Sequence, residues 1–151
     1  MSDLIDRLEV MLRQESSAYE TKDYLSIDHQ KRLATEIHAD SCCLASDVSS
    51  QSSAGDINET WREKICQWSY QVIDHFDFSR EVVMIAMNIL DRYLALQAVN
   101  KQVFQLAAMT SLFLAIKLNE PGKLSMASMV ELSRGYFRVD QMAAMEVSIL
   151  R

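Results

Sequence analysis

The hydrophobic positions follow a helical period through most of the chain from residue 58 onward. Apolar side chains recur there every three or four residues, which is the pattern of a helix with one buried face. No stretch keeps the strict alternation of a half-buried strand. The pattern therefore predicts an all-α fold. The predicted buried stripes are Trp61, Ile65, Trp68, Val72 and Phe76; Val83, Met87, Leu90 and Leu94; Met126, Met129 and Val130; and Val139, Met142, Ala143, Ile149 and Leu150.

One helix, predicted at about residues 102–118, is apolar on nearly every side. Only Gln105, Thr110, Ser111 and Lys117 interrupt the run VFQLAAMTSLFLAIKL. A helix of this kind must be surrounded by other elements rather than laid on a surface. At ~1.5 Å per residue it is about 24 Å long, which is short of a membrane span. We therefore predict a five-helix bundle around this buried central helix.

Residues that cap or end helices stand at the predicted boundaries. Asn58, Ser79 and Asn100 each precede a helical stretch, where a side-chain oxygen can accept a hydrogen bond from a free amide of the first turn. Pro121 and Gly122 follow the central helix, and proline disfavours helix at the residue before it. The last two helices are predicted at about residues 125–134 and 139–150.

The N-terminal part of the chain has weaker patterns. Leu4, Leu8, Met11 and Leu12 share one face of a predicted amphipathic helix at residues 3–14. A broken turn or helix at residues 24–27 and a weak helix at 28–44 follow. The serine-rich run ASDVSSQSSAG then indicates a flexible linker. The predicted organisation is an N-terminal helical extension at 1–44, a linker at 45–56 and a compact domain at 57–151.

Composition and charge narrow the function classes. A length of 151 residues suggests one domain with an appendage. The net charge of −6 and the lack of a Lys/Arg cluster argue against a nucleic-acid surface. The N-terminus is charged and amphipathic, unlike a secretory signal. Three cysteines, an odd number, form no disulfide framework, so reduced thiols in the cytosol or nucleus are expected.

Catalytic and metal-binding patterns are weak. His38, Cys42 and Cys43 can gather on one helical side, but their spacing matches no established metal motif. The chain has no Gly-rich phosphate loop and no nucleophile–base constellation. The sequence therefore predicts a protein that is not an enzyme, with no catalytic residue, no cofactor and no metal.

Four charged residues lie within or beside the predicted apolar stripes. Arg62 and Asp91 stand next to bulky apolar side chains, so they either pair with polar partners or remain solvated at the surface. Lys117 ends the central helix, where the helix dipole favours a cation. Glu146 lies within the last stripe, either as an edge residue or as half of a pair at a recognition surface. The spacing alone leaves these alternatives open.

Four segments resemble, in order and spacing, the motifs of the N-terminal cyclin box. They are WREKICQW, NILDRYLA, FQLAAMTSLFLAIKLNE and MEVSIL. The resemblance covers about residues 57–151. It implies a five-helix bundle around a buried third helix, which agrees with the pattern. It also implies a regulatory subunit that binds and activates a cyclin-dependent serine/threonine kinase by holding the kinase αC helix in its active position.

The resemblance assigns roles to the charged residues. It implies that Arg62 and Asp91 form an internal salt bridge, whose disruption costs about 3–5 kcal/mol when such a pair is buried. It implies that Lys117 and Glu146 contact the kinase. The remaining residues of the implied kinase-binding face are Leu114, Leu118, Glu120 and Leu150.

The sequence departs from the family at the patch that many cyclins use to dock substrates. Trp61, Trp68 and Gln105 match this patch. Its middle apolar position is instead Lys64, and the acidic residue that receives a substrate arginine is replaced by Gln71. Losing that charge removes a charge-assisted contact, which argues against substrate docking of the usual kind.

A second cyclin repeat does not follow the box. The chain is therefore expected to be a fragment, a shortened product or a single-box protein, with apolar surface that a second repeat or a kinase would cover. The alternative function is a cyclin-box adaptor that binds other proteins without activating a kinase. Expected partners are a cyclin-dependent kinase and its substrates or inhibitors, without nucleic acid or membrane. The expected location is the nucleus and cytoplasm.

Overall fold

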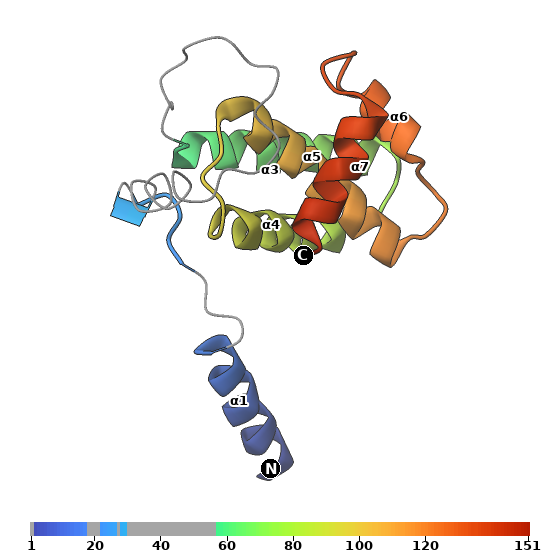
Figure 1. The fold of residues 1–151 in the computed structure, drawn as a ribbon. Coiled ribbons are helices and arrows are strands. Elements are labelled where there is room, and N and C mark those ends of the chain that lie inside the picture. Colours follow the sequence, from blue (N-terminus) through green and yellow to red (C-terminus); the bar gives the residue numbers. More distant parts are fainter. Residues whose placement is uncertain (1, 18–21, 27, 30–56) are drawn as a thin grey trace.

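The computed structural model describes residues 2–17, 22–26, 28–29 and 57–151, and these residues form helices without any strand (Figure 1). This confirms the all-α prediction. The predictions for the rest of 28–44, for the linker at 45–56 and for His38, Cys42 and Cys43 lie outside the described residues. The helices are α1 (Ser2–Glu15), α3 (Glu59–His75), α4 (Glu81–Leu94), α5 (Lys101–Asn119), α6 (Met126–Glu131) and α7 (Val139–Ile149).

Helix α5 is the centre of the bundle, as predicted. Every residue from Ala107 to Ile116 is buried. Its most extensive packing is against α4 and α7, and α3 and α6 also contact it. Ala107 and Ala115 are fully buried, and their small side chains allow neighbouring helices to approach closely. The nearly uniform hydrophobicity of this segment follows from its contacts on several sides.

Two of the three predicted N-caps are present. The side chain of Asn58 accepts a hydrogen bond from the Trp61 amide at 3.2 Å. Asn100 accepts one from the Val103 amide at 2.9 Å. Ser79 was wrongly predicted to cap the next helix. Helix α4 begins after Arg80, which forms no side-chain cap.

Helix α6 is shorter than the predicted 125–134. Ser125 caps it by accepting from the Ser128 amide at 3.1 Å, but the helix ends at Glu131. The backbone then turns through two left-handed residues, Arg134 at φ 52° and Gly135 at φ 81°. Glycine adopts this conformation without steric cost. These two residues lie in the connection to α7, three and four residues after the end of α6.

The predicted stripe of α7 is confirmed at Met142 and Ile149 but is wrong at its two ends. Met142 and Met145 are buried, and Ile149 is partly buried, at a spacing of three and four residues. Val139 and Leu150 were expected inside but are 45% and 69% exposed. Val139 is the first residue of α7, and Leu150 follows its last residue.

The N-terminal helix α1 is confirmed at the predicted position and lies apart from the bundle in Figure 1. Its apolar side chains remain exposed: Leu4 61%, Leu8 49%, Met11 61% and Leu12 63%. Further along, Tyr24 is buried in a short turn rather than a helix. The division into extension, linker and compact domain stays a prediction.

Candidate protein-binding site

Lys117 and Glu146 form an ion pair between α5 and α7, with 2.8 Å between Nζ and Oε1. Lys117 belongs to the last turn of α5, where a cation interacts favourably with the helix dipole. Its side chain is 57% exposed, whereas that of Glu146 is 13% exposed. The ammonium group of Lys117 is therefore open to solvent, and the largely buried carboxylate of Glu146 holds it in place between the two helices. Glu146 is therefore paired, and its place in a recognition surface stays a prediction.

Exposed apolar side chains flank this pair at the ends of the two helices. Leu118 and Leu150 are each 69% exposed, and Val147 is 53% exposed. Sequence reasoning did not select Val147, because it lies outside the apolar stripe of its helix. Leu114 was predicted to contribute surface, but it is only 4% exposed and lies one turn before Leu118 within α5. It supports this face from within and presents almost no surface.

Glu120 was predicted to belong to the same face, but its carboxylate forms contacts within this chain. It accepts a hydrogen bond from the Ser79 amide at 2.9 Å and forms an ion pair with Lys123. The contacts with Lys123 and the Ser79 amide hold the pKa of Glu120 below its usual value. Glu120 therefore joins the end of α5 to the residues before α4.

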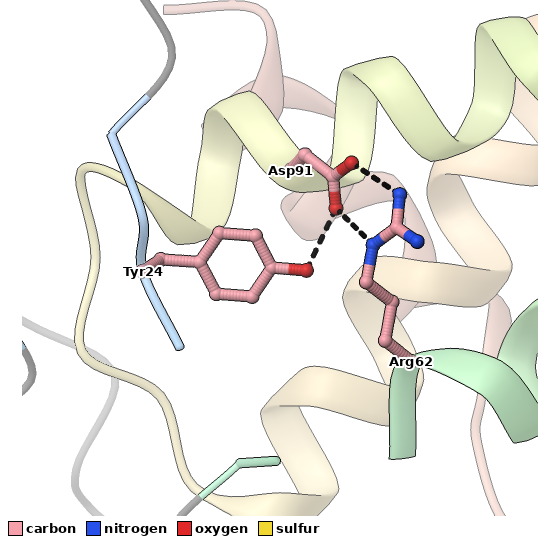
Figure 2. Close-up of polar contacts among 3 residues, drawn as sticks. All are labelled: Tyr24, Arg62 and Asp91. Atoms are coloured by element: carbon pink, nitrogen blue, oxygen red, sulfur yellow. Dashed lines mark hydrogen bonds and ion pairs between the residues drawn. The ribbon is translucent and has the colours of Figure 1, made fainter. Parts of the chain in front are cut away.

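Arg62 and Asp91 form the salt bridge that the resemblance implied, and it joins α3 to α4 (Figure 2). The guanidinium donates from Nε to Oδ1 at 3.0 Å and from Nη2 to Oδ2 at 2.7 Å. The hydrogen bond to Asp91 raises the pKa of Arg62 further above its already high value. The side chains of Arg62 and Asp91 are 38% and 23% exposed. Removing one partner of this pair should therefore cost less than it would for a fully buried pair, because water can solvate part of the charged group that remains.

Tyr24 is a third member of this cluster, and no pattern in the sequence indicated it. Its hydroxyl donates to Oδ1 of Asp91 at 2.7 Å, across 67 residues of sequence (Figure 2). Burial and the contact with Asp91 raise the pKa of Tyr24. A second contact lies close by in sequence, where His29 Nε2 is 2.9 Å from the Ala95 carbonyl oxygen. The described residues at 22–29 thus attach the N-terminal part to α4.

The patch residues Trp61, Trp68 and Gln105 come together and line a groove of about 480 Å³, with Lys64 at its edge. This groove lies between α3, α5 and the connection from α6 to α7. Gln71 is not among its lining residues, so that part of the predicted patch lies elsewhere. The connection contributes Leu132 and Phe137, among others, which sequence reasoning did not assign to the patch.

The described part of the chain contains no group of three or more His, Cys, Asp or Glu side chains that could hold a metal ion. Within the same ranges, no helix combines the length and hydrophobicity that crossing a bilayer requires. Cys66 carries a free, partly buried thiol. The geometry described above offers surfaces for binding other proteins: an ion pair with apolar flanks, and an aromatic groove.

Comparison with known families gives the same result as the motifs and the helical architecture. Residues 35–151 match the cyclin N-terminal domain. The chain belongs to the cyclin N-terminal domain family. The matching segment includes every helix of the cyclin-box bundle, from α3 to α7. The family resemblance stated from the sequence is therefore confirmed.

Similar cyclins come from plants and animals. The chain is 34% identical over 98 residues to G2/mitotic-specific cyclin-2 of Antirrhinum majus, which covers 65% of this chain and 22% of that cyclin. It is 32% identical over 96 residues to G2/mitotic-specific cyclin-B2 of Rana japonica, covering 64% of this chain and 24% of that cyclin. The aligned region thus spans about a quarter of the length of these relatives.

Proposed function

We propose that this cyclin-box protein is a regulatory subunit that binds and activates a cyclin-dependent serine/threonine kinase in cell-cycle control. The observation that carries the proposal is the Lys117–Glu146 pair, whose lysine is exposed, with the exposed Leu118 and Leu150 beside it. Interfaces combine an apolar centre with a few positioned charges, and this face has both. The mitotic names of the relatives support the cell-cycle assignment.

The proposed mechanism is a shift of the kinase population toward its active conformation. A kinase is active when the glutamate of its αC helix pairs with its catalytic lysine. A partner favours that state only if it binds the active conformation more tightly than the inactive one. The Lys117–Glu146 face would supply this difference by holding αC inward. The cyclin box itself would perform no chemistry, and we propose that it acts in the nucleus and cytoplasm.

The test is co-precipitation of the purified chain with a panel of cyclin-dependent kinases, followed by a kinase activity assay. We expect the Lys117→Ala/Glu146→Ala variant to lose kinase binding and activation, because both charges that position αC are removed. Its helical content, measured by circular dichroism, should remain unchanged, since Lys117 is exposed and Glu146 loses its cation at the same time. Retained binding by this folded variant would refute the proposal.

A matched control removes an ion pair at the other end of α7. Arg138 and Asp140 pair at 2.9 Å and have side chains that are 73% and 67% exposed. The Arg138→Ala/Asp140→Ala variant should bind the kinase as the wild type does. Kinase binding without activation, in both the wild type and this control, would instead favour the adaptor function.

A further inference from the structure

Tyr24 is the one buried side chain among the described residues at 22–29. It is 7% exposed, whereas Lys22, Asp23 and Asp28 are exposed and the other described residues of this segment are partly buried. A segment with few buried apolar contacts opens locally at a lower free energy than the core. The attachment of the described residues at 22–29 to the bundle therefore depends strongly on this single aromatic ring.

The polar end of this ring belongs to a cluster whose charges balance. The Tyr24 hydroxyl donates to Oδ1 of Asp91 at 2.7 Å, and Asp91 also accepts two hydrogen bonds from Arg62 (Figure 2). Burial and the contact with Asp91 raise the pKa of Tyr24, so the hydroxyl stays neutral at pH 7. One guanidinium then faces one carboxylate, and the net charge of the three side chains is zero.

A phosphate group on the Tyr24 hydroxyl would destroy this balance. Phosphorylation removes the hydroxyl proton that Asp91 accepts and adds a charge of about −1.5 to −2 at pH 7. The single guanidinium of Arg62 would then face both a carboxylate and a phosphate. Placing excess negative charge at a partly buried position is costly, and the phosphate and the carboxylate repel each other. The docked position of Tyr24 and a phosphate on its oxygen therefore exclude each other.

We propose that Tyr24 is a site of phosphorylation by a protein tyrosine kinase, and that the phosphate releases the described residues at 22–29 from α4. The phenolic oxygen attacks the γ-phosphorus of ATP, and the bond from that phosphorus to the bridging oxygen breaks. ADP leaves, and the phenolic proton passes to the carboxylate base of the tyrosine kinase.

The order of events follows from the burial of Tyr24. Its hydroxyl is inaccessible while the segment is docked, so the tyrosine kinase acts on the locally open form, and the phosphate then prevents reclosing. Opening also breaks the contact between His29 and the Ala95 carbonyl and uncovers the end of α4. Asp91 keeps its salt bridge to Arg62, so the bundle stays folded. The proposal does not depend on the function of the Lys117–Glu146 face.

The test treats the full chain with Mg²⁺, ATP and a broad-specificity tyrosine kinase domain, chosen because it phosphorylates a synthetic peptide of residues 21–30. Fragmentation mass spectrometry assigns the phosphate to individual tyrosines over time. Tyr136 is 64% exposed and gives the rate at an open position. We expect Tyr24 to be modified more slowly in the folded chain than in the peptide. Asp91→Asn should raise the rate at Tyr24 about tenfold and leave Tyr136 unchanged, because it weakens a hydrogen bond to a charged group.

Two controls separate local opening from general effects of the substitution. Asp74→Asn makes the same chemical change in the exposed salt bridge with Arg80, and it should leave the rate at Tyr24 unchanged. Tyr70 is partly buried within α3, so its phosphorylation reports unfolding of the bundle. Tyr70 should stay slow in Asp91→Asn while Tyr24 becomes fast.

Amide hydrogen exchange then compares the phosphorylated chain with the unmodified chain. We expect the phosphate to remove protection at residues 22–29 and to leave α3, α4 and α5 protected. Co-precipitation of cyclin-dependent kinases by both preparations reports separately on the proposed function.

Four results would overturn the proposal. Tyr24 could stay unmodified in both the wild type and Asp91→Asn, or be modified at the same rate in both. Equal acceleration at Tyr70 and Tyr24 would mean that only unfolding of the bundle exposes Tyr24. Retained protection at residues 22–29 after phosphorylation would mean that Arg62 holds the phosphate in the docked position.

Discussion

The Asp91 carboxylate accepts hydrogen bonds from two parts of the chain at once. Arg62 reaches it from α3 through two nitrogen atoms, and Tyr24 reaches it from the N-terminal segment. One acidic group on α4 thereby fixes two other segments. The loss of this carboxylate must therefore cost more than the loss of either donor alone, since it leaves both donors without their acceptor.

The first prediction compares the two ends of this salt bridge. We expect Asp91→Ala to lower the free energy of unfolding by about 2–3 kcal/mol and Arg62→Ala by about 1–2 kcal/mol. The smaller cost for Arg62→Ala arises because Asp91 keeps its bond to Tyr24. Urea unfolding followed by circular dichroism measures both values.

A matched control is available for this comparison. Arg80 and Asp74 form a salt bridge with the same two-nitrogen geometry, at 3.1 and 2.9 Å, but with side chains 71% and 50% exposed. Asp74→Ala should change stability little, because water replaces the lost contacts. If Asp91→Ala proves no more costly than Arg62→Ala, then Asp91 does not act as the shared acceptor.

A second prediction concerns the hydroxyl of Tyr24 and its dependence on pH. Tyr24→Phe should lower the free energy of unfolding by about 1.5–3 kcal/mol at pH 7, as expected for a hydrogen bond to a charged group. The folded state raises the pKa of Tyr24, so the protonated form is stabilised by folding. The stabilisation is complete below the unfolded pKa of about 10 and is lost as the pH rises above it.

The stability difference between the wild type and Tyr24→Phe should therefore be constant from about pH 7 to 9 and shrink above about pH 10. Each pH unit above that point should remove about 1.4 kcal/mol, because the unfolded tyrosine ionises and the folded one does not. Other groups titrate in both proteins, and the subtraction cancels them. A difference that stays constant to pH 11 would contradict the assignment of this hydrogen bond.

At the scale of single helices, α5 is buried so completely that the hydrogen bonding of its polar side chains affects stability. Thr110 donates its hydroxyl to the Leu106 carbonyl at 2.8 Å. Ser111 is 1% exposed, and its hydroxyl has no hydrogen-bond partner among the described residues. A buried hydroxyl without a partner costs about 1–3 kcal/mol. The Ser111 hydroxyl therefore lowers the free energy of unfolding, although it lies in the most buried helix.

The third prediction is that Ser111→Ala raises the free energy of unfolding by about 1 kcal/mol. Ser69 provides the matched control, because it is also 1% exposed in a helix but donates to the Ile65 carbonyl at 2.8 Å. Ser69→Ala should give no such gain, since it removes a satisfied hydrogen bond. Thermal and urea unfolding of both variants test this. Equal effects of the two substitutions would contradict the prediction.

At the scale of the whole molecule, the sequence was most informative where a pattern repeats locally. The buried run of α5 and the caps at Asn58 and Asn100 were predictable, because helix period and capping depend on neighbouring residues. The end of α6 was not. Arg134 adopts a left-handed conformation that only the tertiary structure imposes, since arginine has no preference for it.

The candidate sites were predictable in part. The pairing of Arg62 with Asp91 followed from the family resemblance and is present in the structure. The resemblance gave Lys117 and Glu146 only as kinase contacts, and their ion pair is a finding of the structure. The third member, Tyr24, could not be found, because no periodic spacing relates it to a partner 67 residues away. Surfaces assembled from several elements could not be predicted from the sequence either. Leu132 and Phe137 line the groove, and only the structure shows that they lie beside α3 and α5.

The distance between Tyr24 and Asp91 along the chain has a consequence for synthesis. Translation adds about 5–20 residues per second, so the 67 residues between them take about 3–13 seconds. During that interval the acceptor of Tyr24 has not yet been made, and Arg62, which is 29 residues from Asp91, waits a shorter time. The N-terminal segment is therefore made first but can dock only after α4 has emerged, in the reverse of the order of synthesis.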